Sequence, residues 1–187
     1  MGTAARPQDL FAADSDVAAL VYGRSDDPDT LLATFASDLA AQGFDVVGLL
    51  QRRRRGAEGA IAAVDFMLFP DASPVGAGVP CADALSAAEP SLRDAVRRRP
   101  DLLVVNRFGS AELSGGGLLG VLTDAVRLEV PVLIAVPQAI FTDWLGFSGG
   151  LTIRLDCRRA GLDRWWASLS TAAPYKSGAR TLCERIK

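Results

Sequence analysis

Arginines, carboxylates and backbone amides carry the candidate chemistry of this sequence, because it contains no histidine. This composition excludes serine–histidine–aspartate and cysteine–histidine catalysis, and it removes the ligands of the usual zinc and facial-triad iron sites. The three cysteines, Cys81, Cys157 and Cys183, are odd in number and far apart in the sequence. That pattern argues against a disulfide framework and predicts reduced thiols in a cytoplasmic protein.

Candidate ligand-binding residues follow the apolar runs that we expect to form a parallel sheet. Ligands of such sheets bind beyond the carboxyl ends of the strands, where loops and helix N-termini converge. This rule selects the segments 23–30, 51–55, 106–112 and 137–143. In and beside these segments, the residues that we expect to contact a ligand are Gly23, Arg24, Ser25, Thr30, Gln51, Arg52, Asn106, Arg107, Gly109, Ser110, Ser114 and Gln138.

The segment 23–30 has the position and the length of a Walker A phosphate loop, with Gly23 first and Thr30 last. Such a loop needs a second glycine, so that amides can wrap a phosphate, and a lysine that neutralises it. Here Pro28 replaces the glycine and Asp29 replaces the lysine, which reverses the charge. We expect no ordinary triphosphate cradle. Two interpretations stay open: a polar loop in which Pro28 or Asp29 begins a helix, and an active phosphate loop.

Four consecutive arginines at residues 52–55 lie in a segment that we predict to be a polar hairpin turn. Guanidinium groups form bidentate hydrogen bonds with phosphate, molybdate or carboxylate. The run therefore indicates either an anion site at the functional edge of the sheet or a solvated charged surface.

The segment 106–112 has the place of a Walker B strand end in which asparagine replaces the aspartate. Asn106 and Thr30 are the candidate magnesium ligands, and Arg107 is a candidate anion contact. Glu112 is the candidate catalytic residue, because its carboxylate is the one well placed in sequence to orient a water molecule. Ser114 and the glycines after it can begin the next helix and present free amides to an anion. The alternative is an ordinary loop with a helix cap.

These segments need a doubly wound α/β fold to bring them together. The alternation of elements predicts a mainly parallel five-stranded sheet with helices on both faces, like that of P-loop nucleoside triphosphatases, with an added antiparallel hairpin strand. The expected strands are 17–22, 46–50, 102–105, 130–136 and 151–155, and 60–69 is the hairpin strand. The expected helices are 29–42, 89–98, 118–128 and 162–169, and 71–80 is expected to be a loop.

The 187 residues suit one domain, which we place at 17–170 between a lead-in at 1–16 and a polar tail at 171–187. The formal net charge of −2 gives no reason to expect nucleic-acid binding. No apolar run reaches the roughly 18 residues of a membrane span, so we expect no membrane insertion. Trp165 and Trp166 are expected to lie in the core or at a homodimer face.

The motif Asn-Arg-Phe-Gly at 106–109, with the segments 130–136 and 144–150, resembles a bacterial domain family of unassigned function. Members of that family are often encoded beside molybdate-transport genes, and some are labelled as nucleoside-triphosphatase-like or as transporter ATP-binding proteins. A more distant resemblance is to small P-loop nucleoside triphosphatases with degenerate Walker motifs. These resemblances imply a role around molybdate transport or molybdenum enzymes.

Three functions stay open. The first is non-catalytic binding of a nucleotide or small oxyanion, with magnesium accompanying a nucleotide. The second is an atypical magnesium-dependent nucleotide hydrolase, in which Arg107 or the arginines 52–55 replace the lysine and Glu112 orients water. The third is an interaction partner of a transporter or metalloenzyme, through the region of Trp165 and Trp166 or through the tail.

Overall fold

The computed structural model describes residues 15–55, 61–75 and 81–172, and they form a seven-stranded sheet with the order β4-β3-β2-β5-β6-β1-β7. The strands are β1 (Val17–Tyr22), β2 (Val46–Arg55), β3 (Ile61–Phe69), β4 (Ser73–Val75), β5 (Leu102–Val105), β6 (Val132–Pro137) and β7 (Ile153–Asp156). The pairs β2–β5, β5–β6, β6–β1 and β1–β7 are parallel. The pairs β2–β3 and β3–β4 are antiparallel. This confirms the α/β class and the mainly parallel sheet.

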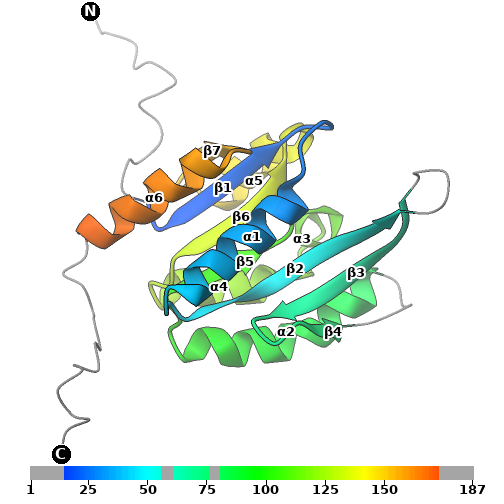
Figure 1. Ribbon diagram of the computed structural model, residues 1–187. Helices are drawn as coiled ribbons and strands as arrows, with labels where there is room; N and C mark the ends of the chain where they lie inside the picture. Colours follow the sequence, from blue (N-terminus) through cyan, green and yellow to red (C-terminus); the bar gives the residue numbers. More distant parts are fainter. Residues whose placement is uncertain (1–14, 56–60, 76–80, 173–187) are drawn as a thin grey trace, which may run out of the picture.

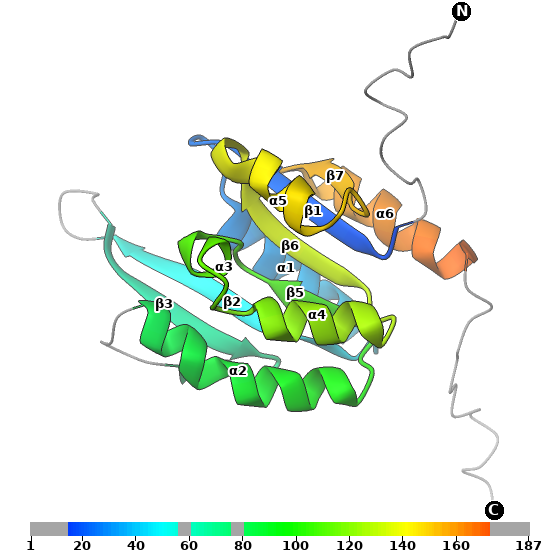
Figure 2. The same ribbon diagram turned by 180° about the vertical axis from the view of Figure 1, so that it is seen from behind.

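Helices cover both faces of this sheet (Figures 1 and 2). One face carries α1 (Pro28–Ala41) and α6 (Arg159–Ala172), and the other carries α2 (Cys81–Arg97), α4 (Leu119–Arg127) and α5 (Phe141–Phe147). The short elements α3 (Ser110–Leu113) and η2 (Gln138–Ile140) follow β5 and β6. Because the central strands are covered on both sides, β5 is buried at every position and its sequence is continuously apolar rather than alternating.

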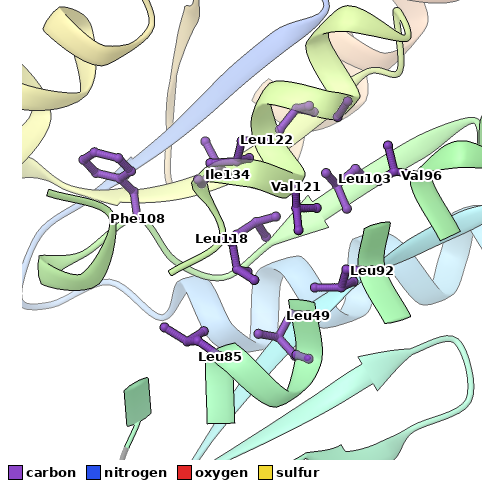
Figure 3. Packing of buried hydrophobic residues seen from close by; sticks show 14 of the residues in the cluster. Leu49, Leu85, Leu92, Val96, Leu103, Phe108, Leu118, Val121, Leu122 and Ile134 are labelled. Carbon is purple, nitrogen blue, oxygen red and sulfur yellow. The ribbon is translucent and has the colours of Figure 1, made fainter. Parts of the chain in front are cut away.

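The side chains of successive strand residues divide between two cores. Figure 3 shows Leu92 of α2 and Val121 of α4 in one cluster with Leu49, Leu103 and Ile134 of the sheet. Leu133, next to Ile134, belongs instead to the core beneath α1 and α6. The sheet is therefore held from both sides, and the carboxyl ends of its parallel strands are fixed at one edge.

The structure differs from the sequence-based expectation in the number and length of several elements. The sheet has seven strands rather than five, because the predicted hairpin strand pairs with β2 and because β4 lies inside the segment 71–80 that we expected to be a loop. Helix α2 begins at Cys81 rather than near residue 89, and Pro90 lies inside it. The arginines 52–55 belong to β2 rather than to a turn.

The expected lead-in and tail are described only where they join the domain. Most of the predicted lead-in and tail, residues 1–14 and 173–187, lies outside the described residues, as do 56–60 and 76–80. Ser15 and Asp16 are attached to the domain, because their carbonyl oxygens accept hydrogen bonds from Trp165 Nε1 and from the amide of Val132. Trp165 is only 3% exposed, so its ring belongs to the core.

Candidate functional site

A cavity of about 770 Å³ lies at the carboxyl ends of the parallel strands. Its lining comes from the ends of β1 and β6 and the residues just after them, from both strands of the β2–β3 hairpin, and from Arg107 after β5. The lining residues are Tyr22, Gly23, Arg24, Asp26, Gln51, Arg53, Val64, Arg107, Pro137, Gln138 and Ala139. Strand β2 pairs with β5 only over Val46–Leu49. Its remaining length extends past β5 (Figure 1) and brings Gln51 and Arg53 to the cavity.

Asp29 is the centre of the charged groups at this cavity. Its carboxylate oxygen Oδ1 accepts hydrogen bonds from Asn106 Nδ2 at 2.8 Å and from Arg107 Nη2 at 3.0 Å. Its Oδ2 lies 3.0 Å from Arg53 Nε. The Asp29 side chain is only 10% exposed, so these contacts are weakly screened by solvent. The residue that reverses the charge of the phosphate loop therefore holds two arginines beside the cavity.

The loop before α1 satisfies its own amide groups with its own carboxylates. Asp26 Oδ2 accepts a 2.7 Å hydrogen bond from the Gly23 amide. Asp27 is the N-cap of α1 and accepts from the Thr30 amide at 3.2 Å and from the Thr30 hydroxyl at 2.7 Å. Pro28 occupies the first helical turn, where a missing amide hydrogen costs little. The Gly23 and Thr30 amides, at the two ends of the loop, are thus occupied, in agreement with the polar-loop interpretation.

The alternation of side chains along β2 separates its arginines. Arg52 and Arg54 lie on the side of β2 that faces Asp65 of β3, and Arg54 makes two contacts with that carboxylate, at 2.7 and 3.0 Å. Arg53 and Gln51 are two residues apart, so they share the other side of the strand and line the cavity. The structure therefore does not bring Arg52, which we expected at the ligand, to the cavity; Arg53 takes that place.

Four buried polar atoms near Asp29 have no hydrogen-bond partner among the described residues. They are Tyr22 Oη, Gln51 Oε1, Asn106 Oδ1 and Arg107 Nε. The Arg107 guanidinium lies 5.1 Å from the centre of the Tyr22 ring, and a cis peptide bond joins Asn106 to Arg107. Unpartnered buried groups are costly in a protein interior, so these atoms mark places that a ligand group or a water molecule can satisfy.

Burial governs the two titratable groups that could otherwise supply a nucleophile. Burial raises the pKa of the Tyr22 phenol above its ordinary value, against the opposing effect of Arg107. Burial, together with the carboxylates of Asp26, Asp27 and Asp29, raises the pKa of Cys157 to about 11. Both groups are therefore protonated at neutral pH, and Tyr22 offers the cavity a neutral hydroxyl.

Glu112 has a structural role in the loop after β5. Its Oε2 accepts from the Gly109 amide at 2.9 Å, and its Oε1 accepts from the Leu118 amide at 3.0 Å. Gly117 has a positive φ of 58°, and a side chain there would collide with the Glu112 carboxylate. Glu112 is 4% exposed and does not line the cavity. The carboxylate that we expected to orient water is thus used to close this loop.

The remaining expected ligand contacts divide into two groups. Gly23, Arg24, Gln51, Arg107 and Gln138 line the cavity. The others do not line it: Ser25, Thr30, Arg52, Asn106, Gly109, Ser110 and Ser114.

Several members of the second group pair with protein groups that do not line the cavity. The Ser114 hydroxyl donates to the Ser110 carbonyl at the end of α3, and helix α4 begins only at Leu119, so Ser114 does not begin the next helix. Thr30 is exposed and paired with Asp27, whereas Asn106 is fully buried and paired with Asp29. These two side chains do not fit a shared magnesium site. No group of three or more His, Cys, Asp or Glu side chains in the described part of the chain could hold a metal ion.

The expected segments contain Arg53, Asp26, Pro137 and Ala139, but these residues were not named as individual ligand contacts, and Tyr22 and Val64 lie outside the expected segments. Arg53, Tyr22 and Val64 line the cavity, as do Asp26 and the pair Pro137 and Ala139. Arg53 could have been found by extending β2 through the arginine run and applying the two-residue period of a strand.

No described helix is long and apolar enough to cross a membrane.

Comparisons with known proteins place the chain in a family and a fold. A family model described as "Protein of unknown function (DUF2478)" matches residues 17–75 and 80–165. The Molybdenum import ATP-binding protein ModC 2 of Bradyrhizobium diazoefficiens is 36% identical over 181 residues, covering 91% of this chain and 20% of that protein. The chain therefore spans about a fifth of that relative's length.

One solved structure has a similar fold. The solution structure of a human cancer-related nucleoside triphosphatase is similar with a TM-score of 0.57 and 14% identity, covering 83% of this chain and 96% of that one. This likeness concerns the fold alone, and it confirms the expected resemblance to the nucleoside triphosphatase architecture.

Proposed function

This chain belongs to the family described as a protein of unknown function (DUF2478), and we propose that it binds a small anionic ligand, a nucleotide or an oxyanion, without hydrolysing it. The observation that carries this proposal is the pair of arginines, Arg53 and Arg107, that Asp29 holds at the wall of the cavity. Small-molecule sites are commonly concave spaces of roughly 300–1,000 Å³ with a few fixed polar groups, and the cavity has this character.

Asp29 fixes the two arginines without using up their hydrogen-bonding capacity. It contacts one nitrogen of each guanidinium, Arg53 Nε and Arg107 Nη2. A guanidinium has five N–H donors, so each arginine keeps donors for a phosphate, oxyanion or carboxylate. Arg24 adds a third positive charge to the cavity lining. A ligand oxyanion would therefore meet cationic groups that are already held in place, which lowers the entropy cost of binding.

The same contacts argue for binding rather than hydrolysis. A phosphoryl-transfer site needs a positive charge on the terminal phosphate and a group that positions water. Here Asp29 stands where the lysine would be, and both oxygens of Glu112 accept backbone hydrogen bonds. Glu112 is therefore proposed to support the loop and not to act in catalysis.

The proposal is tested by measuring anion-induced stabilisation and phosphate release in the same preparation. AMP, GMP, ATP, GTP, molybdate, tungstate and sulfate are each added at millimolar concentration, and the melting temperature is followed. We expect at least one anion to raise it, and we expect the rise to disappear in Arg53→Ala and Arg107→Ala but to persist in Arg97→Ala, whose side chain is exposed on α2. Stabilisation by none of these anions contradicts the proposal, as does magnesium-dependent phosphate release by the wild-type chain.

A second candidate is an interaction with a transporter component. It is favoured by the relative that is named as a molybdenum import ATP-binding protein, in which the region similar to this chain is a fifth of the whole. We propose that the domain acts beside such a protein, with the cavity as its ligand site. Co-purification with a molybdate-transport ATPase, retained in Arg107→Ala, supports this association, and failure of the two purified proteins to bind contradicts it.

A further inference from the structure

The polar atoms left without partners at the cavity describe the ligand more closely than the arginines do. Gln51 Oε1 and Tyr22 Oη are buried, and both residues line the cavity. An amide oxygen only accepts hydrogen bonds, whereas a phenol can donate and accept. In this orientation Gln51 can accept a hydrogen bond from a donor group on the ligand, an N–H or an O–H, in addition to the oxygens that the arginines would bind.

A bare oxyanion meets only half of this requirement. Sulfate and molybdate carry oxygen acceptors and no donors when they are fully ionised, so they can satisfy the arginines but leave Gln51 Oε1 unpartnered. A buried acceptor that stays unpartnered keeps its desolvation cost. The lining also includes Val64, Pro137 and Ala139, which offer an apolar wall that a five-atom ion does not use.

The charge of the cavity limits the charge of the ligand. Arg24, Arg53 and Arg107 are balanced in part by Asp26, which lines the cavity, and by Asp29, which touches two of the arginines. The site is thus only weakly positive. Two amides of the loop before α1, a kind of group that helps to hold a polyphosphate in other proteins, are occupied: Asp26 accepts from the Gly23 amide and Asp27 accepts from the Thr30 amide. A triphosphate finds neither the charge nor the amides that it needs.

We propose that the cavity selects an organic anion of one or two negative charges, a phosphate monoester or carboxylate, whose flat or apolar body carries an N–H or O–H donor for Gln51. This inference rests on the proposed anion-binding function and narrows its ligand class. The arginines bind the anionic group of the ligand, and Gln51 and Tyr22 form hydrogen bonds with polar groups at the edge of its body. The apolar wall contacts the face of that body.

Matched probes separate the contribution of the donor from that of the anion. Orotate is a flat monoanion with ring N–H donors, and benzoate is a flat monoanion without them. AMP and GMP pair in the same way with phenyl phosphate, while ATP, sulfate and molybdate represent the other classes. Dissociation constants are measured by calorimetry. We expect the donor-bearing member of each pair to bind about tenfold more tightly, and we expect AMP or GMP to bind more tightly than ATP, sulfate and molybdate.

The variant Gln51→Met keeps the length of the side chain and removes the amide. We expect it to reduce the orotate-to-benzoate affinity ratio to within about threefold of unity. The control Gln42→Met makes the same change at the exposed carboxyl end of α1, the end opposite to Asp29, and should keep the ratio, because Gln42 does not line the cavity. Circular dichroism and melting temperatures of both variants verify that they are folded.

The outcomes distinguish this inference from the function on which it rests. Tighter binding of molybdate, sulfate or ATP than of orotate, AMP and GMP overturns the inference and leaves anion binding intact. Equal affinities within each matched pair, or an unchanged ratio in Gln51→Met, overturn it as well. If none of the probes binds, the proposed function fails together with the inference.

Discussion

The placement of Asp29 shows how one side chain can have an effect opposite to the one its charge suggests. An aspartate in a phosphate loop should repel anions, yet its contacts with Arg53 and Arg107 turn it into the support of a cationic wall. The sequence cannot reveal this, because the two arginines are remote from Asp29 along the chain and meet it only when β2, β5 and α1 converge.

The dual effect of Asp29 leads to a prediction with two readouts. Asp29→Asn keeps the shape but removes the charge that balances two partly buried arginines. We expect the free energy of unfolding to fall by about 2 kcal/mol and the affinity for sulfate to fall by about tenfold, because the two guanidinium groups are no longer held in place beside the cavity. Urea unfolding and calorimetry measure the two effects. Asp143→Asn, at an exposed carboxylate in α5, is the control; tighter sulfate binding in Asp29→Asn would contradict the role of Asp29 as the support of the two arginines.

Substitution of Glu112 tests whether its carboxylate supports the loop or acts in catalysis. In Glu112→Gln one of the two carboxylate acceptors becomes an amide donor, so either the Gly109 or the Leu118 amide loses its partner. We expect a loss of about 1–3 kcal/mol in unfolding free energy with unchanged affinity for the ligand. The matched change Glu89→Gln, at a half-exposed pair with Arg93, should cost less than about 1 kcal/mol. Equal stabilities of the two variants would argue against the structural role.

At the scale of elements, the start of α1 depends on one cap whose strength varies with pH. The hydrogen bond from the Thr30 side chain, chiefly, lowers the pKa of Asp27 below its ordinary value. A carboxylate with a lowered folded-state pKa stabilises the fold above its unfolded pKa, and this contribution is lost as the pH falls through the folded value. Asp27→Ala should therefore cost about 1 kcal/mol at pH 7, and less at pH 3. Urea unfolding at both pH values measures this, and Asp71→Ala, in an exposed turn, should show no such cap loss; a cost independent of pH would contradict the cap.

How much the sequence predicts also differs between elements. The runs that became β1, β5 and β6 are apolar at successive positions, and that pattern is enough to identify strands buried on both faces. The extension of β2 was missed, because arginines have no apolar alternation and their strand conformation depends on pairing with β3. Cavity residues on the strand ends, such as Gln138, could be predicted from the edge rule, whereas Arg53 and Asp29 required the register and the tertiary contacts.

At the scale of the whole molecule, the two cores share one sheet, and β6 contributes neighbouring residues to each. Ile134 packs beneath α2 and α4, and Leu133 packs beneath α1 and α6; both are fully buried. Each strand contributes side chains to both cores, so loss of the packing on one face of the sheet would also disrupt the packing on the other face. The domain should therefore unfold as one cooperative unit, and the cavity should be lost with it.

This cooperativity is tested by truncating one residue of each core. Ile134→Ala and Leu133→Ala should each lower the unfolding free energy by about 2–5 kcal/mol with the same dependence on urea as the wild type. Val126→Ala, at a side chain that is 55% exposed, should change it by less than about 0.5 kcal/mol. Tryptophan fluorescence reports on the α5 face through Trp144 and on the α6 face through Trp165. If the two faces were independent, Leu133→Ala would shift the far-ultraviolet circular dichroism and fluorescence transitions to different urea concentrations; coincident transitions in both variants are the expected result.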